Sequence, residues 1–288
     1  MLSRIFSTAT SSKITNALRT HPDNLYLEYI KDLRNLPAFD KELIYLRTYS
    51  IFSACFSKLT YDEYISYCSN IPVVIQKILM LKDKTYNIDV GYIMISCDEL
   101  FLKEGDKSKE NTYFSTQCIF TVLPHYRGIS NGLRLQDACE AIIRSEYPNR
   151  NRVSINTTLN PVFYDYRQNL TPLVFPSQKK NLNQEPENLI KTFMKKQNLE
   201  PINEEKPFVV SLPLTIVGAD AAKYKANYKN SSEGVQFFID QTGLEKDMIL
   251  INMAIYNLIE GNTLGLPGKS YEKVNENPFE LRDYVIVS

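Results

Sequence analysis

The chain of 288 residues contains no tryptophan, two histidines and no excess of either charge, since 33 Lys and Arg residues balance 33 Asp and Glu residues. A neutral chain has no overall field that attracts a polyanion, so we expect no nucleic-acid partner and only a local anion site, if any. With two histidines and no carboxylate–histidine cluster, the sequence indicates neither a zinc site nor a Cys–His nucleophile. No metal is therefore predicted.

Long hydrophobic runs are missing as well. No apolar run approaches the roughly 18 to 20 uninterrupted residues that a membrane-spanning helix requires, so we expect no membrane partner. The five cysteines are odd in number, widely spaced and without C-x-x-C pairing, which is typical of reduced, buried side chains. The 43% of hydrophobic residues is enough for a sizeable core, so we predict a soluble globular protein.

The composition of the amino-terminal segment gives information on the cellular location of the protein. Its first 22 residues lack Asp and Glu and hold basic residues among several Ser and Thr, a composition similar to that of a mitochondrial transit peptide. A frayed terminus or an amphipathic first helix explains the same residues and is preferred. The richness in Lys, Asn and Ile is compatible with an effector that a bacterium secretes into a host cell. We predict a cytoplasmic location, with secretion and mitochondrial import as alternatives.

The most informative segment is an apolar run that leads through a glycine-containing turn into an amphipathic run. Residues 113–122 are rich in aromatic and β-branched side chains, which predicts a strand that ends before Pro124. After Gly132, apolar residues recur at helical spacing as far as Pro148. Amides at the start of a helix attract anions, so the turn predicts a pyrophosphate site. An ordinary strand-to-helix corner is the alternative.

Two blocks carry a family resemblance. Arg127-Gly128-Ile129-Ser130-Asn131-Gly132 resembles the Arg/Gln-x-x-Gly-x-Gly/Ala signature of the GNAT acetyltransferase superfamily, with Ser130 in place of its first glycine. A short strand at 152–158, then Asn160 and a short helix over 162–170, resembles the family's next block. There Tyr166 falls about one residue short of the family's tyrosine spacing, and Leu170-Thr171 replaces Gly-Phe. Together the two blocks cover roughly residues 60 to 177.

The resemblance implies an α/β fold with a GNAT-like mixed central sheet flanked by helices, and it implies acetyl-CoA as the cofactor. In the family, the pantetheine arm of coenzyme A enters between two splayed strands and bonds to free backbone groups of the first. The residues implied to bind the cofactor are those backbone groups, the turn with its helix start, and one asparagine: Phe120, Thr121, Val122, Arg127, Gly128, Ile129, Ser130, Asn131, Gly132, Leu133 and Asn160.

The implied function is that of an acyl-CoA-dependent N-acyltransferase, which moves an acetyl group from acetyl-CoA to an amine on a small molecule or protein by direct attack on the thioester. A backbone amide would stabilise the oxyanion, and Tyr166 or Tyr164 would give a proton to the sulfur. The general base stays open between Glu99, Glu110 and a water chain. One alternative is a catalytically degenerate GNAT-like protein-interaction module, and another is a generic nucleotide or sugar-phosphate site. The acceptor and the oligomeric state stay open.

Before the first block, we expect helices across residues 22–70, one of them opened by Thr60 as N-cap with Glu63 at the capping-box position. An antiparallel hairpin of 72–81 and 89–97 follows, and a loop over 98–111. A right-handed crossover makes 113–122 and 152–158 parallel neighbours. Tyr61, Tyr64 and Tyr67 recur at helical spacing, which indicates a helix-face stripe or a wall of the acceptor site.

The expected domain organisation has three parts: an N-terminal helical extension over 1–40, the GNAT-like core over 41–218, and a C-terminal helical region over 219–288. A polar insertion of about 178–206 interrupts the core and contains a helix at 186–197. Residues 207–218 have strand character and are expected to supply the last strand. Residues 231–242 and 244–260 are expected to be helices, the second more apolar than a surface helix. Gly268-Lys269-Ser270 lacks the earlier glycine of a P-loop and is not taken as one.

Overall fold

The computed structural model describes residues 21–56, 59–69, 73–127, 131–177, 184–211, 219–245, 247–271, 273 and 276–286. The strands within these residues are β1 (Leu25–Ile30), β2 (Ile75–Asp83), β3 (Ile88–Phe101), β4 (Thr112–Val122), β5 (Asn151–Thr158), β6 (Val174–Phe175), β7 (Val209–Ser211), β8 (Met248–Asn257) and β9 (Glu280–Asp283). The helices are α2 (Ala38–Cys55), α3 (Tyr61–Ser69), α4 (Asn131–Glu146), α5 (Pro161–Leu170), α6 (Gln184–Lys196), α7 (Ala219–Ala226) and α8 (Glu233–Thr242).

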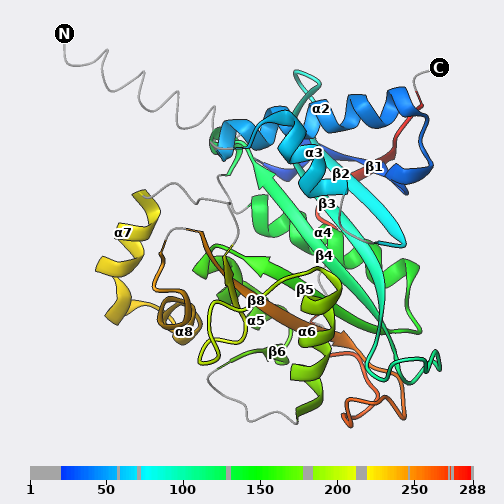
Figure 1. Cartoon of the computed structure of the whole chain (residues 1–288). Helices are drawn as coiled ribbons and strands as arrows, with labels where there is room; N and C mark the ends of the chain where they lie inside the picture. The colour runs from blue at the N-terminus through cyan, green and yellow to red at the C-terminus, as the bar shows by residue number, and fades with distance from the viewer. Residues whose placement is uncertain are drawn as a thin grey trace.

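The strands form one mixed sheet (Figure 1) in the order β6-β8-β5-β4-β3-β2-β1-β9, with β7 also paired to β8. The pairs β4–β5 and β1–β9 are parallel, whereas the other pairs are antiparallel. The parallel β4–β5 pair is connected through α4, as the sequence predicts for a crossover unit. The predicted α/β class with a mixed central sheet and flanking helices is confirmed.

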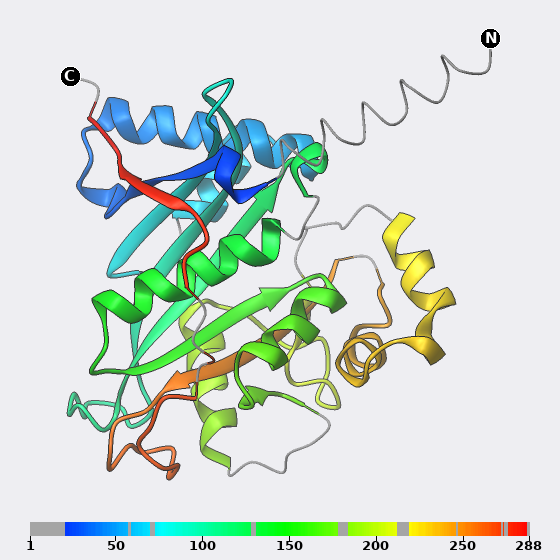
Figure 2. The ribbon, with the colours of Figure 1, turned by 180° about the vertical axis from the view of Figure 1, so that it is seen from behind.

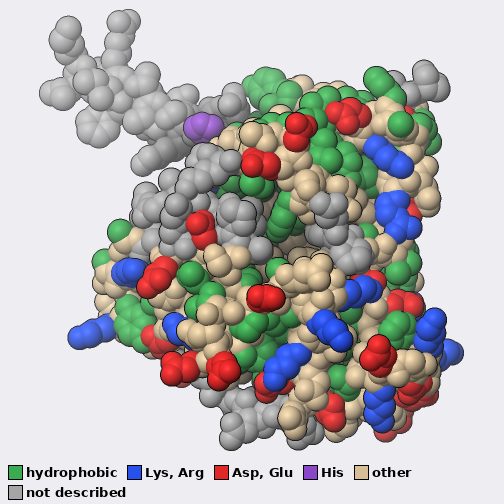
Figure 3. Space-filling model, in the orientation of Figure 1, with side chains coloured by type: hydrophobic (Ala, Val, Ile, Leu, Met, Phe, Trp, Pro, Cys, Tyr) green, Lys and Arg blue, Asp and Glu red, His purple; other side chains and the backbone are tan. Residues whose placement is uncertain are grey.

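Helices cover both faces of the sheet. In the view of Figure 1, α2, α3 and α6 lie in front of the strands, and in the reverse view of Figure 2 α4 and α5 lie in front. The side chains of α4 pack with one face of β2, β3 and β4, and those of α2 and α3 pack with the opposite face of β2 and β3. Figure 3 shows acidic and basic side chains interspersed over the front face, as the zero net charge allows.

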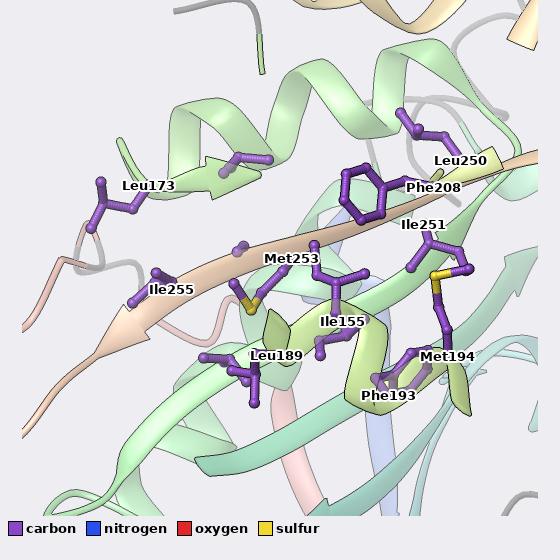
Figure 4. Close-up of a cluster of buried hydrophobic side chains, with 14 of the residues drawn as sticks. Ile155, Leu173, Leu189, Phe193, Met194, Phe208, Leu250, Ile251, Met253 and Ile255 are labelled. Carbon is purple, nitrogen blue, oxygen red and sulfur yellow. The ribbon is translucent and has the colours of Figure 1, made fainter. Parts of the chain in front are cut away.

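The largest hydrophobic cluster lies where α6 covers β5 and β8. Leu189, Phe193 and Met194 of α6 are buried against Ile155 of β5 and Ile251 of β8, as Figure 4 shows. These α6 positions recur at i, i+4 and i+5, so they share one face of the helix. The helix predicted at 186–197 within the polar insertion is α6 (Gln184–Lys196), and it contributes to the core.

The largest correction to the predicted elements is at 244–260. Met248–Asn257 is not a helix but β8, which lies between β5 on one side and β6 and β7 on the other. The run is apolar on both of its faces because helices cover both faces of the sheet there, and periodicity cannot distinguish such a strand from a buried helix. Residues 207–218 therefore do not supply the last strand; they contain β7, and residues 212–218 lie outside the described part.

The N-terminal region also departs from the prediction. Leu25–Ile30 is β1 rather than part of a helical extension, and it pairs with β2 and β9. Five of its six residues are buried, on both faces of the strand. The sequence therefore lacks the alternation of apolar and polar residues that predicts a strand with one exposed face. The predicted loop of 98–111 begins later than expected, because β3 continues to Phe101.

Several local predictions are confirmed. The Thr60 hydroxyl accepts from the Glu63 amide at 3.3 Å, and the Glu63 carboxylate accepts from the Thr60 amide at 2.7 Å, which is the reciprocal capping box. β2 and β3 form the antiparallel hairpin, and α8 corresponds to the predicted helix of 231–242. All five cysteines are free thiols, and the predicted burial holds for Cys68, Cys97 and Cys139, whereas Cys55 and Cys118 are half-buried.

Among the described residues, no helix has the length and apolar character needed to cross a bilayer.

The contact between α5 and α8 generates a stability prediction. A Cβ at Gly234 of α8 would lie 2.4 Å from Asp165 Oδ1 and 3.3 Å from Asp165 Cα on α5. We expect Gly234→Val to lower the free energy of unfolding by about 1 to 3 kcal/mol in urea denaturation, because the helices must move apart. Gly132→Ala is the control, since its Cβ would meet only Phe120 at 3.7 Å. Equal stability of Gly234→Val and wild type would contradict the close packing.

Candidate functional site

The candidate site lies where β4 and β5 separate. Their parallel ladder runs from Tyr113 opposite Asn151 to Thr116 opposite Ser154 and stops there. β4 nevertheless continues to Val122, paired with β3, and β5 continues to Thr158, paired with β8. The sheet thus opens between two pairs of strands, at the carboxyl ends of β4 and β5, where ligands bind in open α/β sheets.

One side chain fills the start of this opening. Asn156 Oδ1 of β5 accepts from the Cys118 amide of β4 at 2.8 Å, in the place of a main-chain acceptor. Asn156 Nδ2 donates to Ser154 Oγ at 3.2 Å, and Ser154 Oγ donates to the Thr116 carbonyl at 3.2 Å. Asn156 is 1% exposed, so this amide–carbonyl bond lies in the interior. Asn156 therefore stabilises the point at which the two strands diverge.

Beyond Asn156, backbone groups of β4 face the opening. The Cys118 amide points to β5 and the Leu123 amide donates to Val90 of β3 at 2.8 Å. Because successive residues of a strand alternate, the backbone groups of Phe120 and the amide of Val122 also point toward β5. The described part of β5 supplies no ladder partner to them.

Two of the predicted backbone contacts need correction. Thr121 stands in register with Tyr92, and its carbonyl lies 3.0 Å from a Cβ built at Gly91, so its backbone groups point to β3 and not into the opening. The Val122 carbonyl already accepts from Arg127 Nε at 2.7 Å. Of the backbone groups predicted at Phe120, Thr121 and Val122, those of Phe120 and the Val122 amide face the opening. Within β4, Cys118, Ile119 and Phe120 are the half-exposed residues, and they lie in the diverging stretch.

The turn that follows β4 is anchored on both sides. Pro124–Tyr126 is a 3-10 turn, and the Tyr126 hydroxyl donates to Asp83 Oδ2 at 2.9 Å. Asn131 Nδ2, at the start of α4, donates to the Tyr126 carbonyl at 2.9 Å. Gly128, Ile129 and Ser130 lie outside the described residues. Arg127 is exposed and His125 is exposed beside it.

The start of α4 lies next to the opening. A Cβ on Gly132 would lie 3.7 Å from Phe120 Cε2, so these residues of α4 and β4 approach closely. Phe120 also contacts Phe163 of α5, with 4.7 Å between ring centroids. Leu133 is half-buried on α4. The structure thus brings the end of β4, the start of α4 and the start of α5 together around Phe120.

A buried polar network continues from the opening into α5. Arg167 is fully buried, and its guanidinium donates to the Ser154 carbonyl at 2.6 Å and to Asn252 Oδ1 at 2.7 Å. Asn252 Nδ2 of β8 donates to Thr158 Oγ1 at 2.6 Å. Arg167 therefore connects α5 to β5 and β8, at the residue where the β4–β5 ladder ends. These two bonds hold its guanidinium against neutral oxygens of β5 and β8.

The two predicted proton donors face different surroundings. The Tyr166 hydroxyl donates to Asp137 of α4, and burial together with this carboxylate raises the pKa of Tyr166 above its usual value. Tyr164 is 0% exposed, packs against Phe237 and donates to the Pro176 carbonyl at 2.5 Å. Burial raises the pKa of Tyr164. Of the two, Tyr166 lies between the helices that border the opening, so it is the one retained as a candidate.

The other predicted site residues are placed as follows. Asn160 is the N-cap of α5, where its Oδ1 accepts from the Val162 amide at 2.9 Å. Glu99 forms an ion pair with Arg150 and stands in register with Phe114, at the opposite end of β4 from Phe120. Glu110 lies just before β4, near the same end. Glu99 and Glu110 therefore lie at the end of β4 away from the opening.

Asn156, Arg167 and Asn252 were missed as candidate site residues by the sequence reasoning. Two signals point to them: Ser154, Asn156 and Thr158 are polar residues on one face of β5, and Asn252 interrupts the apolar run of β8. A polar residue inside an apolar strand needs a buried partner. Among the described residues, no group of three or more His, Cys, Asp or Glu is placed to hold a metal ion.

Comparison with solved structures finds GNAT acetyltransferases. Naa50 of Arabidopsis thaliana, in complex with a bisubstrate analogue, matches with 14% identity and a TM-score of 0.34 over 81% of this chain and 99% of that chain. A GNAT family acetyltransferase of Brucella melitensis, in complex with acetyl-CoA, matches with 14% identity and a TM-score of 0.30 over 46% and 76%. A variant of the spermidine N-acetyltransferase of Vibrio cholerae matches with 12% identity and a TM-score of 0.31 over 51% and 78%.

The chain is thus structurally similar to GNAT acetyltransferases at low TM-score and low identity. No protein-family model and no curated protein matches the chain.

The role of Asn156 can be tested by amide hydrogen exchange. In Asn156→Ala the Cys118 amide loses its acceptor, so we expect its exchange to accelerate at least tenfold relative to the Leu123 amide of the same strand, which donates to Val90. We also expect a loss of about 1 to 3 kcal/mol in stability, the cost of an unpaired buried amide. Asn169→Ala, on the exposed side of α5, is the control. Unchanged protection of Cys118 would show that Asn156 does not stabilise the divergence.

Proposed function

We propose that the protein is an acyl-CoA-dependent N-acyltransferase that moves an acyl group, most often acetyl, from coenzyme A to an amine. The observation that supports this most is the opening between β4 and β5, because no described residue of β5 pairs with the backbone groups of Phe120 or with the Val122 amide. A buried or half-buried amide needs an acceptor. A ligand with amide groups along an extended arm meets that need, and pantetheine is such an arm.

The residues around the opening fit coenzyme A in two further respects. The start of α4 lies beside Phe120, and helix N-termini attract phosphate groups. Gly132 has no side chain at this point, so the backbone of α4 is accessible to a ligand. In this proposal Asn131, Gly132 and Leu133 would bind the pyrophosphate, with Arg127 at the exposed edge and Asn160 at the start of α5. Gly128, Ile129 and Ser130, which lie outside the described residues, stay predicted binding residues.

When bound, acetyl-CoA supplies an activated acyl group, and the chain supplies its orientation. The Phe120 backbone groups would hold the arm, and a backbone amide facing the opening would stabilise negative charge on the reacting carbonyl oxygen. Direct attack requires an uncharged amine and a proton for the leaving sulfur. Tyr166 is one proposed source of that proton, provided that its hydroxyl leaves Asp137.

The second candidate function is a catalytically degenerate, GNAT-like interaction module. A specific observation favours it, since the hydroxyl groups of Tyr166 and Tyr164 both donate to acceptors within the protein. In that case coenzyme A would bind without turnover. Release of free thiol in the presence of an amine distinguishes the transferase from this module.

The proposal is tested with variants of Gly132. Gly132→Trp places an indole at the start of α4 beside Phe120, so we expect acetyl-CoA to bind at least tenfold more weakly in calorimetry, which is about 1.4 kcal/mol. Gly132→Ala adds a Cβ with room for it and is expected to bind as the wild type does. If acetyl-CoA neither raises the melting temperature of the wild type nor binds in calorimetry, the proposed function is wrong.

A further inference from the structure

Two thiols meet beside the point where β4 and β5 separate. Cys118 lies on β4, in the stretch beyond the end of the ladder at Thr116, and Cys139 lies on α4. Their Sγ atoms are 3.9 Å apart and share a hydrogen bond in which either thiol can be the donor. Two sulfur atoms in a disulfide are about 2.05 Å apart, so an approach of roughly 2 Å would join them.

The two thiols differ in accessibility. Cys118 is half-buried, as are the next two residues of β4, whereas Cys139 is fully buried in the cluster between α4 and the sheet. The hydrogen bond with Cys118, together with burial, raises the pKa of Cys139, which keeps this thiol protonated at neutral pH. A reagent that enters the opening therefore meets Cys118 first, and Cys139 is placed to react second.

The other three cysteines are not placed to react with Cys118. Cys97 of β3 stands in register with Thr116, so it is a diagonal neighbour of Cys118 on the same face of the sheet. Diagonal Cβ atoms lie roughly 7 Å apart, whereas a disulfide needs about 3.5 to 4.5 Å. The remaining two lie on the helices of the opposite face, Cys55 on α2 and Cys68 on α3. The α4 thiol is therefore the partner of Cys118.

We propose that Cys118 and Cys139 form a reversible disulfide when the protein meets the disulfide of a small thiol, and that this bond weakens coenzyme A binding at the neighbouring opening. The disulfide itself is independent of the proposed function. Its effect on coenzyme A rests on that function.

The exchange takes place in two steps and uses one molecule of the reagent. First, the Cys118 sulfur bonds to one sulfur of the reagent, whose own S–S bond breaks, and the Cys118 proton passes to the thiolate that leaves. Then the Cys139 sulfur bonds to the Cys118 sulfur, the bond from Cys118 to the reagent breaks, and the Cys139 proton passes to the second leaving thiolate. The two cysteines lose two electrons, and the reagent becomes two thiols.

The effect on coenzyme A follows from the position of the bond. It joins α4 to β4, and the same two elements approach each other where Gly132 of α4 lies beside Phe120 of β4, with 3.7 Å from a Cβ built at Gly132 to Phe120 Cε2. Phe120 lies two residues after Cys118, on the same face of the strand. Because interiors are close-packed, pulling α4 toward β4 at Cys118 reduces the space beside Phe120.

The first test is peptide mapping of the full chain after incubation with oxidised glutathione. We expect the loss of two hydrogen atoms, no retained glutathione, a bond between the peptides of Cys118 and Cys139, and full reversal by dithiothreitol. In Cys139→Ala, which keeps a small apolar side chain in the core, we expect one glutathione to stay on Cys118. Cys55→Ser removes the other half-buried thiol and is expected to form the same disulfide as the wild type.

Three results of the mapping would overturn the disulfide: an unmodified Cys118 in the wild type, a stable glutathione adduct there, or a bond from Cys118 to Cys97. Each is read from the wild-type protein, so the result does not depend on whether a variant folds.

The second test is calorimetry of acetyl-CoA binding to the reduced and the oxidised protein. We expect the Kd to rise about fivefold or more on oxidation, and coenzyme A to oppose oxidation by the same factor. Cys118→Ser treated with oxidised glutathione is expected to keep the Kd that it has before treatment. An unchanged Kd in the oxidised wild type would overturn the effect on coenzyme A. Absence of binding to the reduced wild type would overturn the proposed function, whereas the mapping decides on the disulfide alone.

Discussion

The bond between the Cys118 amide and Asn156 Oδ1 is the interaction on which the arrangement of the candidate site depends. Where two parallel strands separate within a sheet, main-chain donors and acceptors lose their hydrogen-bond partners. Each buried group left without a partner costs about 1 to 3 kcal/mol of stability. Asn156 replaces the first missing ladder partner by a side chain from β5 itself. The strands can therefore diverge after Thr116 and Ser154 while the Cys118 amide keeps an acceptor.

The surrounding helices follow from this branch point. Arg167 of α5 donates to the Ser154 carbonyl and to Asn252, so α5 is held to the β5–β8 side of the opening. α4 packs on the β4 side through the buried cluster that contains Leu135, Ala138 and Cys139. The two helices meet across the opening through the bond of Tyr166 to Asp137. A buried network of this kind specifies one geometry, since each lost partner leaves another group unsatisfied.

The sequence predicts the β4–turn–α4–β5 unit well because each of its signals is local: β-branched runs, Pro124, Gly132 and Pro161 at a helix start. It fails for β1 and β8, whose apolar residues are buried on both faces and carry no strand period. For the site, the structure places Gly132 beside Phe120, and the binding role that the resemblance implies for both residues stays a prediction. The roles of Asn156, Arg167 and Asn252 depend on contacts between residues up to 96 positions apart, and a single sequence does not show such contacts.

The most direct measurement is a crystal structure of the protein grown with coenzyme A. The account predicts density for the pantetheine arm between β4 and β5 beyond Asn156, with its amides bonded to the backbone of Phe120 and to the Val122 amide, and with the diphosphate at the start of α4. Density for coenzyme A at another place on the molecule, or a β5 strand paired to β4 as far as Val122, would contradict it.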